Sequence, residues 1–319
     1  MSNTRMDTLV APPLAIEMQK LNASIGKKHI LRDISFQLAS GRLLSILGPN
    51  GAGKTTLIKV LIGGIAPTSG TASVVGFDVT RHLLHIKRRI GITPQENNLY
   101  EDLSAAENLQ LHGRLFGMSG KQIRARTDEV LDLVDLRKRK KDTVKHFSGG
   151  MKRRLVIARS IFHYPDIVFL DEPTTGLDPD ARRSIWQMIQ GLKQQHVSLL
   201  LTTHYMEEAE QLSDDVIVMN SGMIIAEGTT SSLLSEHVGG AFVELTGVSE
   251  EHQQEIQRLF PQVQVFENEA VRIPTSDLAD IPGVIQTLAQ KDLPYASILT
   301  RKATLEDVFF KLTGRKIAP

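Results

Sequence analysis

A glycine-rich stretch near residue 50 holds the residues best suited to chemistry. GPNGAGKTT, residues 48–56, matches the pattern G-x-x-x-x-G-K-S/T, whose glycines let backbone N–H groups point inward around a phosphate. We expect Lys54 to bridge the β- and γ-phosphates of a nucleotide, Thr55 to bind Mg²⁺ and Thr56 to add a phosphate hydrogen bond. A chance glycine-rich turn is the alternative, but the strand expected before the motif and the helix expected after it favour a phosphate loop. The expected phosphate-loop residues are Gly48, Pro49, Asn50, Gly51, Ala52, Gly53, Lys54, Thr55 and Thr56.

Two adjacent carboxylates end the apolar stretch IVFLDEP, residues 167–173. A strand buried on both faces tolerates acids only at its end, where water or a cation meets them. We therefore expect Asp171 to bind Mg²⁺. Glu172, which points elsewhere, is expected to take a proton from an attacking water. An acid pair that caps a helix is the alternative.

Two further polar residues follow expected core strands. His204 ends VSLLLTTH, and Gln95 follows RRIGITP. Ligands of open α/β sheets bind at the carboxyl ends of strands, so we expect His204 to be catalytic. The Gln95 amide is expected to coordinate Mg²⁺ or the reacting water. Taken alone, these residues would be a hydrogen-bonded structural histidine and an ordinary loop glutamine.

A second anion site is suggested by HFSGGMKRRL, residues 146–155, where Ser-Gly-Gly opens a basic helix. At such a helix start, exposed N–H groups and the helix dipole favour the same bound anion. The candidate residues are Ser148, Gly149 and Gly150. The alternative is a flexible turn, but a turn need not open a basic helix.

The elements that must position these motifs alternate between apolar strands and amphipathic helices. This order predicts an α/β core with buried parallel strands, preceded by strands near residues 14–39. Between them, residues 104–164 read as a helical stretch. Ser104 and Ser119 open it with expected capping boxes. Asp178, followed by proline, is expected to be the N-cap of a later helix.

The sequence changes character from about residue 236. Short strands and two helices follow, which predicts a small α+β unit with no visible chemical motif. Thr304 and Asp307 are expected to cap its last helix. A role in dimer stabilisation or regulation and a purely structural role are equally open for this unit.

Composition narrows the class of protein. The 319 residues are 41% hydrophobic and 23% charged, which is ordinary for a globular protein. The formal net charge of +1 argues against a nucleic-acid partner, and the absence of cysteine excludes disulfides and thiolate sites. No signal-peptide pattern occurs, nor any apolar run of about 18 residues. We therefore expect a soluble chain that meets a membrane only through a partner.

Taken in order, GPNGAGKTT, TPQ, FSGGM, FLDEP, GLD and TTH resemble the ATP-binding subunits of ABC transporters over roughly residues 14–230. SGGMKRRL, DEPTTGLDP, TTHYMEEAE and LEDVFFKLTGR resemble the drug-export and nodulation-factor-export ATPases in particular. The resemblance implies an α/β P-loop NTPase core with an antiparallel β subdomain and a helical subdomain at about residues 100–164. It implies a flexible N-terminus at residues 1–13, an ATP-binding domain at 14–235 and an accessory α+β domain at 236–319.

The resemblance also explains why one chain carries two anion sites. It implies that two ATP molecules with Mg²⁺ lie between two chains, and that Ser148, Gly149 and Gly150 contact the γ-phosphate held by the partner chain. Asp178 would lie at the dimer seam. The partners implied are a second ATPase subunit, as a homodimer or a paralogous heterodimer, and separate transmembrane permease subunits. The chain would then be a peripheral exporter ATPase on the cytoplasmic face of the plasma (inner) membrane, and Gln95 would help to pass the change to the permease.

Several readings remain open beside this one. Where many family members stack adenine on an aromatic residue, the aligned position is Ile25, with His29 as a candidate substitute. A soluble ATPase acting on ribosomes or DNA usually carries two cassettes or a long coiled coil, which this chain has no room for. A small-molecule P-loop kinase leaves FSGGM and GLD unexplained. The basic run 137–141 is expected to be a solvated loop, with lipid or permease contact as the alternative.

Overall fold

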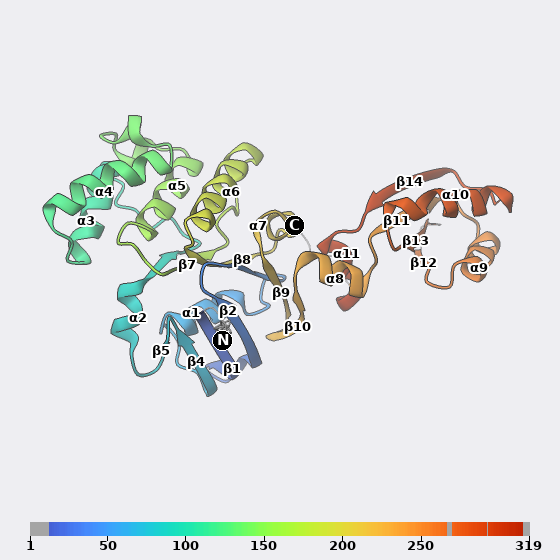
Figure 1. Ribbon diagram of the computed structural model, residues 1–319, viewed down its shortest axis with the longest axis horizontal. Helices are drawn as coiled ribbons and strands as arrows, with labels where there is room; N and C mark the ends of the chain where they lie inside the picture. Colours follow the sequence, from blue (N-terminus) through green and yellow to red (C-terminus); the bar gives the residue numbers. More distant parts are fainter. Residues whose placement is uncertain (1–12, 267–269, 292, 315–319) are drawn as a thin grey trace, which may run out of the picture. The chain divides into compact units, whose positions relative to one another are not determined.

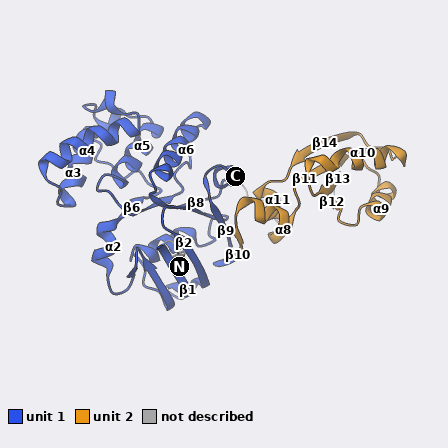
Figure 2. Ribbon diagram, viewed as in Figure 1, with its two compact units in different colours: residues 1–225 blue, residues 226–319 orange. Residues whose placement is uncertain are grey.

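The computed structural model describes residues 13–266, 270–291 and 293–314 (Figure 1). Apart from residue 13, the N-terminal segment predicted to be flexible lies outside them. The chain forms two compact units, residues 1–225 and 226–319 (Figure 2). The division falls before the boundary expected at residue 235, because helix α8 (Thr230–His237) packs against helix α11 (Leu305–Thr313) of the second unit.

An antiparallel sheet opens the first unit. In spatial order its strands are β2 (Lys28–Ala39), β1 (Leu14–Ile25), β4 (Ser69–Val74) and β5 (Phe77–Asp78). Along β2, Ile34, Phe36 and Leu38 are buried, whereas Ser35 and Gln37 between them are exposed. This alternation is typical of a sheet with one face against the core.

A second sheet of six strands carries the site. In spatial order its strands are β10 (Met223–Gly228), β9 (Asp215–Asn220), β3 (Leu43–Leu47), β8 (Ser198–Thr203), β7 (Ile167–Asp171) and β6 (Ile90–Thr93). From β9 to β6 all neighbours are parallel, and β3, β7 and β8 are buried at every position. Because parallel neighbours end at the same edge, the segments after β3, β7 and β8 are brought together.

Helices cover this sheet and form a separate helical region (Figure 1). The helices of the first unit are α1 (Lys54–Leu61), α2 (Leu83–Arg89), α3 (Ala105–Leu115), α4 (Gly120–Leu133), α5 (Gly149–Ser160), α6 (Pro179–Gln194) and α7 (Met206–Leu212). The capping boxes expected at Ser104 and Ser119 open α3 and α4. The predicted α/β fold with an antiparallel β subdomain is confirmed.

The basic run 137–141 begins with a short 3₁₀ helix, Arg137–Arg139, next to α4. Three of its five basic side chains form ion pairs with acidic neighbours: Arg137 with Asp128 and Asp132, Arg139 with Asp142, and Lys140 with Asp128. This pairing supports the expectation of a solvated surface segment. Among the described residues, no helix is long and apolar enough to cross a membrane.

The second unit has a core of its own. Its sheet, in spatial order, consists of β12 (Gln264–Phe266), β13 (Ala270–Thr275), β11 (Ala241–Thr246) and β14 (Ser297–Lys302). Its other helices are α9 (Glu250–Leu259) and α10 (Ile281–Gln290). Helices α8 and α9 were not expected from the sequence. Helix α8 buries a single apolar side chain, Leu233, whereas α9 and the residue that follows it pack Ile256, Leu259 and Phe260 into the core of the unit. The cap at the start of α11 is present, with Asp307 accepting from the Thr304 backbone N–H at 2.9 Å.

Candidate nucleotide site

The phosphate loop connects β3 to α1. Gly51 and Gly53 have φ angles of 81° and 107°, in the left-handed region that favours glycine. A Cβ at Gly48 would lie 2.4 Å from the Met219 carbonyl oxygen, so this position also requires glycine. The loop is therefore shaped by its own sequence, and it delivers Lys54 at the first turn of α1.

Lys54 is almost fully buried, with a side-chain exposure of 4%. Its ammonium donates to the carbonyl oxygens of Gly48 at 2.8 Å and Pro49 at 3.2 Å, and lies 3.2 Å from a carboxylate oxygen of Glu172. A phosphate that accepts a hydrogen bond from Lys54 would consequently lie next to the Glu172 carboxylate. Lys54, the expected phosphate ligand, and Glu172, the expected base, are therefore in direct contact.

Asp171 ends β7 and faces two hydroxyl groups. Its Oδ1 accepts from Thr202 at 2.6 Å and from Thr55 at 3.3 Å. Carboxylate and hydroxyl oxygens are the ligands that Mg²⁺ prefers, so the chemistry of Thr55 and Asp171 fits that ion. Thr202, on the neighbouring strand β8, orients the carboxylate.

Glu172 follows directly and has a φ angle of 45°, unusual for a residue with a Cβ. Its Oε2 accepts from the Thr175 hydroxyl at 3.1 Å and lies 3.4 Å from Nδ1 of His204. Burial alone would raise the pKa of Glu172, but the nearby charge of Lys54, together with His204 and Thr175, outweighs it and holds the pKa below its ordinary value. The carboxylate is therefore ionised at neutral pH and able to accept a proton.

Gln95 is placed differently from this cluster. Its side chain is exposed, and in the described part of the chain it makes no hydrogen bond to Thr55 or Asp171. Its backbone carbonyl instead accepts from Arg153 at 3.3 Å. The structure therefore brings Lys54, Thr55, Asp171, Glu172 and His204 together, whereas the Gln95 side chain stays apart.

The Ser-Gly-Gly start of α5 also lies apart from the phosphate loop. Ser148 is the N-cap of α5, and its hydroxyl accepts from the Met151 N–H at 3.3 Å. A Cβ at Gly150 would approach the Ala181 Cβ to 3.0 Å, so α5 begins beside the first turn of α6. Asp178 caps that turn, accepting from the Ala181 N–H at 2.8 Å. Among the residues described, the Ser148 hydroxyl bonds within its own helix turn and makes no hydrogen bond to the phosphate loop.

Comparison with known proteins assigns the family. Residues 31–175 match the ABC transporter family. The Nod factor export ATP-binding protein I of Paraburkholderia xenovorans (strain LB400) is 39% identical over 306 residues, which cover 96% of this chain and 99% of that one. The daunorubicin resistance ATP-binding protein DrrA3 of Streptomyces coeruleorubidus is 37% identical over 304 residues, covering 94% and 96%. The chain belongs to the ATP-binding subunits of ABC transporters.

Solved structures agree with this assignment. The ATP-binding subunit of an ABC transporter is 29% identical and has a TM-score of 0.63, covering 70% of this chain and 92% of its own. An ATP-binding cassette solved as a dimer in a post-hydrolysis state, bound to ADP and Pi, is 25% identical with a TM-score of 0.61, covering 67% and 98%. As an ABC ATP-binding subunit, the chain binds ATP and hydrolyses it to ADP and phosphate.

The start of β2 lies beside the phosphate loop of this ABC site. A Cβ at Gly53 would meet the Leu31 side chain at 2.9 Å, so the start of β2 packs against the loop. Ile25, which ends β1 a few residues earlier, is 51% exposed. That Ile25 lies where an aromatic ring would stack on adenine stays a prediction.

Four contributors to the ABC site do not follow from the sequence motifs. Thr202 orients Asp171, Thr175 donates to Glu172, and Arg153 binds the loops that follow β6 and β7. Glu208, fully buried, accepts from Thr174 at 2.8 Å and from Trp186 at 3.0 Å. The indole N–H of Trp186 thus has a buried polar partner. Of these four residues, only Thr202 had a signal in the sequence, because it lies in the TTH motif that ends at His204.

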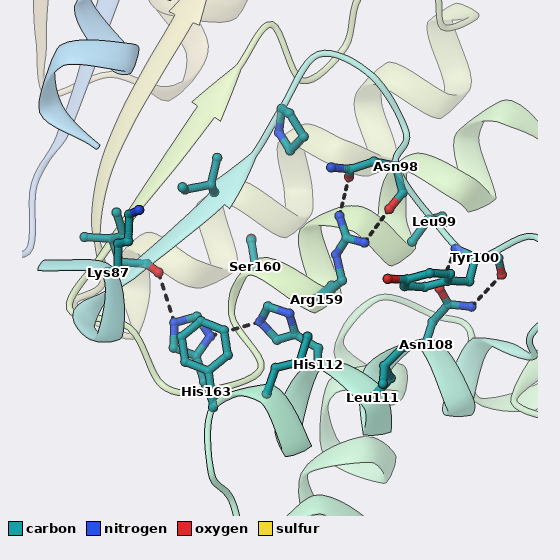
Figure 3. A pocket seen from close by; sticks show the side chains of 15 residues that line it. Lys87, Asn98, Leu99, Tyr100, Asn108, Leu111, His112, Arg159, Ser160 and His163 are labelled. Carbon is teal, nitrogen blue, oxygen red and sulfur yellow. Dashed lines mark hydrogen bonds between the residues drawn. The ribbon is translucent and has the colours of Figure 1, made fainter. Parts of the chain in front are cut away.

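A groove of about 770 Å³ lies beside the segment that follows Gln95 (Figure 3). Leu115, 74% exposed, contributes to its apolar lining, and Arg159 donates to the Asn98 carbonyl at 2.6 Å. His112 and His163 form a pair, with 3.3 Å between their ring nitrogens. Burial lowers the pKa of His112 to about 3, so this histidine is neutral at physiological pH.

Proposed function

We propose that this ABC subunit is the ATPase of an exporter and drives a separate transmembrane permease from the cytoplasmic face of the membrane. The export assignment is supported by the relatives named for Nod factor export and daunorubicin resistance. The groove beside Gln95 is the proposed contact with the permease, since it combines exposed apolar side chains with the cation of Arg159. The chain would therefore be held at the membrane by its partner.

In the proposed mechanism, Lys54 and the phosphate-loop amides hold the β- and γ-phosphates of ATP. Thr55 and Asp171 would hold Mg²⁺, which when bound neutralises charge on the phosphate oxygens. Glu172 takes a proton from the water that attacks the γ-phosphorus, and the bond to the bridging oxygen of ADP breaks. His204, 3.4 Å from Glu172, is proposed to help place the reacting groups. Gln95 is proposed to join this set by movement of its loop.

Two such chains would complete each other. Ser148, Gly149 and Gly150 lie apart from their own phosphate loop, which supports the proposal that they bind the γ-phosphate held by a second copy. Asp178 would lie at the seam. ATP that binds the closed dimer more tightly than the open pair shifts the population toward closure, and hydrolysis removes that difference.

The observation that carries this proposal is the 3.2 Å contact between Lys54 and Glu172, which supports a site in which the proposed base adjoins the proposed phosphate ligand. We predict that Glu172→Gln keeps ATP affinity, because the isosteric amide preserves the packing, but lowers kcat at least about 100-fold. ATP should then hold the variant as a dimer in size-exclusion chromatography. In cells that carry the permease, export should be lost.

Asp180→Asn, at a highly exposed carboxylate on α6, is the matched control and should behave as the wild type. Hydrolysis at the wild-type rate by Glu172→Gln would remove Glu172 as the base. A wild-type chain that reaches full turnover as a strict monomer would remove the shared site.

A further inference from the structure

Arg153, on the first turns of α5, is a buried cation held by main-chain oxygens. Its side chain is 3% exposed. Nε donates to the Pro173 carbonyl at 2.6 Å, and Nη2 donates to the carbonyls of Asp171 at 3.0 Å and Glu172 at 3.1 Å. Nη1 donates to the carbonyls of Gln95, at 3.3 Å, and Pro94. One guanidinium therefore binds the loop after β6 and the loop after β7 at once.

The cation keeps its charge in this environment. Burial lowers the pKa of Arg153 to about 10, although the carboxylates of Asp171 and Glu208 act in the opposite direction. Because that pKa stays well above 7, the side chain remains a five-proton donor at neutral pH. The planar fork of donors suits two diverging loops, which a single ammonium cannot span.

Neighbouring arginines on α5 have other tasks. Arg154 donates to the Val134 carbonyl at 3.1 Å and so binds the end of α4. Arg159 binds Asn98 at the groove. Of these three arginines, Arg153 alone contacts the residue pair that holds the proposed magnesium ligand and the proposed base.

We propose that Arg153 is a positioning residue, which ties the backbone of Glu172 and of Gln95 to helix α5. Helix α5 begins at the Ser-Gly-Gly segment, so a displacement of that segment by a nucleotide on the partner chain moves Arg153 and, through it, both loops. The Glu172 carboxylate therefore reaches its reactive position only when helix α5 is correctly positioned. This inference rests on the proposed role of Glu172.

The test compares Arg153→Ala with Arg154→Ala in the full-length protein. A misplacement of about 1 Å at the base lowers turnover about 100-fold, so we expect kcat of Arg153→Ala to fall by that order while KM for ATP stays within about threefold. Added guanidinium at non-denaturing concentration should fill the vacated site and restore at least about a tenth of the lost kcat. Arg154→Ala should keep the wild-type kcat and show no response to guanidinium.

Two outcomes would overturn the inference. One is an unchanged kcat in Arg153→Ala. The other is a lowered kcat that guanidinium does not restore, accompanied by a fall in melting temperature, which would show a structural role alone. If Arg153→Ala does not fold, Arg153→Lys replaces it: a kcat equal to that of the wild type would reject the need for two-loop contact, whereas a loss in kcat with unchanged KM and melting temperature supports it.

Failure of the inference is distinguishable from failure of the proposed function. If Glu172→Gln hydrolyses ATP normally, the proposed base is wrong whatever Arg153 does. If Glu172→Gln is inactive and Arg153→Ala is as active as Arg154→Ala, the base stands and only the positioning role falls.

Discussion

At Glu172, burial and charge act in opposite directions on one carboxylate. Burial favours the protonated form, but Lys54 and His204 nearby keep the group ionised. Its backbone also adopts a left-handed conformation, which costs on the order of 1 kcal/mol and persists only where the surroundings enforce it. The Glu172 N–H accordingly bonds the Thr202 carbonyl on β8 at 3.0 Å. Strain and charge are thus concentrated at the residue proposed to accept the proton.

Removing the Lys54 ammonium should weaken nucleotide binding. We predict that Lys54→Ala weakens ATP binding about 10- to 100-fold, since it deletes a charge-assisted hydrogen bond to phosphate. Isothermal titration calorimetry in the Glu172→Gln background measures this without turnover. Lys59→Ala, at an exposed lysine on the same helix, is the control and should bind ATP normally. Equal affinity in both variants would contradict the role of Lys54.

At the scale of the element, local hydrogen bonds define where helices begin. Helix α3 opens with a reciprocal pair, in which the Ser104 N–H donates to Glu107 at 2.8 Å and the Glu107 N–H donates to the Ser104 hydroxyl at 3.3 Å. Such a cap depends on residues three positions apart, and its motif can be read from sequence. Helix α3 in turn lines the groove proposed to contact the permease.

Loss of this cap should cost stability without touching the nucleotide. We predict that Ser104→Ala lowers the free energy of unfolding by about 1 kcal/mol, because the Glu107 N–H at the helix start loses its acceptor. Urea denaturation followed by circular dichroism measures the change. Lys121→Ala, at an exposed position on α4, should stay within about 0.5 kcal/mol of the wild type. A Ser104→Ala protein as stable as this control would show that α3 depends on packing alone.

At the scale of the whole molecule, the chain consists of two units with separate cores. The second unit holds a cluster of hydrogen-bonded ion pairs. The Asp307 carboxylate accepts from Arg301 at 2.7 Å and from Arg272 at 3.0 Å, and the Glu244 carboxylate accepts from Arg272 at 2.6 Å. Burial alone would raise the pKa of Asp307, but hydrogen bonds from Arg301 and Thr304 outweigh it and lower the pKa. The cluster therefore joins α11 to strands β13 and β14 through charge.

The lowered pKa gives this unit a defined dependence on pH. A carboxyl group with a depressed pKa stabilises the fold above its ordinary value, 3.8, and loses that contribution as pH falls through the folded pKa. We predict that Asp307→Asn lowers the free energy of unfolding by about 1–3 kcal/mol at pH 7, and that its difference from the wild type shrinks below pH 4. Hydrogen exchange of the second unit at several pH values measures this.

Glu306→Gln, at the exposed neighbouring carboxylate, is the control and should show neither effect. A difference between Asp307→Asn and the wild type that is constant with pH would indicate that Asp307 acts through packing rather than through its charge.

Much of the fold and of the site follows from the sequence because the interactions concerned are local. Gly51 and Gly53 permit the left-handed turns of the phosphate loop. Asp178 caps α6 by accepting from the N–H of Ala181, only three residues further along the chain. The apolar runs of β7 and β8 predict buried parallel strands. Helix α8 did not follow, because its single buried side chain leaves little periodic signal. Helix α9 was missed although Ile256, Leu259 and Phe260 recur at helical spacing and pack in the core of the second unit.

Tertiary structure decided which of these groups meet. The contacts of Lys54 with Glu172, and of Thr202 with Asp171, depend on β3, β8 and β7 being neighbours, which no local pattern specifies. Arg153 looks like a solvated residue of a basic helix until the fold buries it against two loops. Sequence alone determined the phosphate loop, the caps and the strand character, since short-range sterics and hydrogen bonds set them. The order of the strands decided the pairings, because only folding brings distant polar groups into one low-dielectric space.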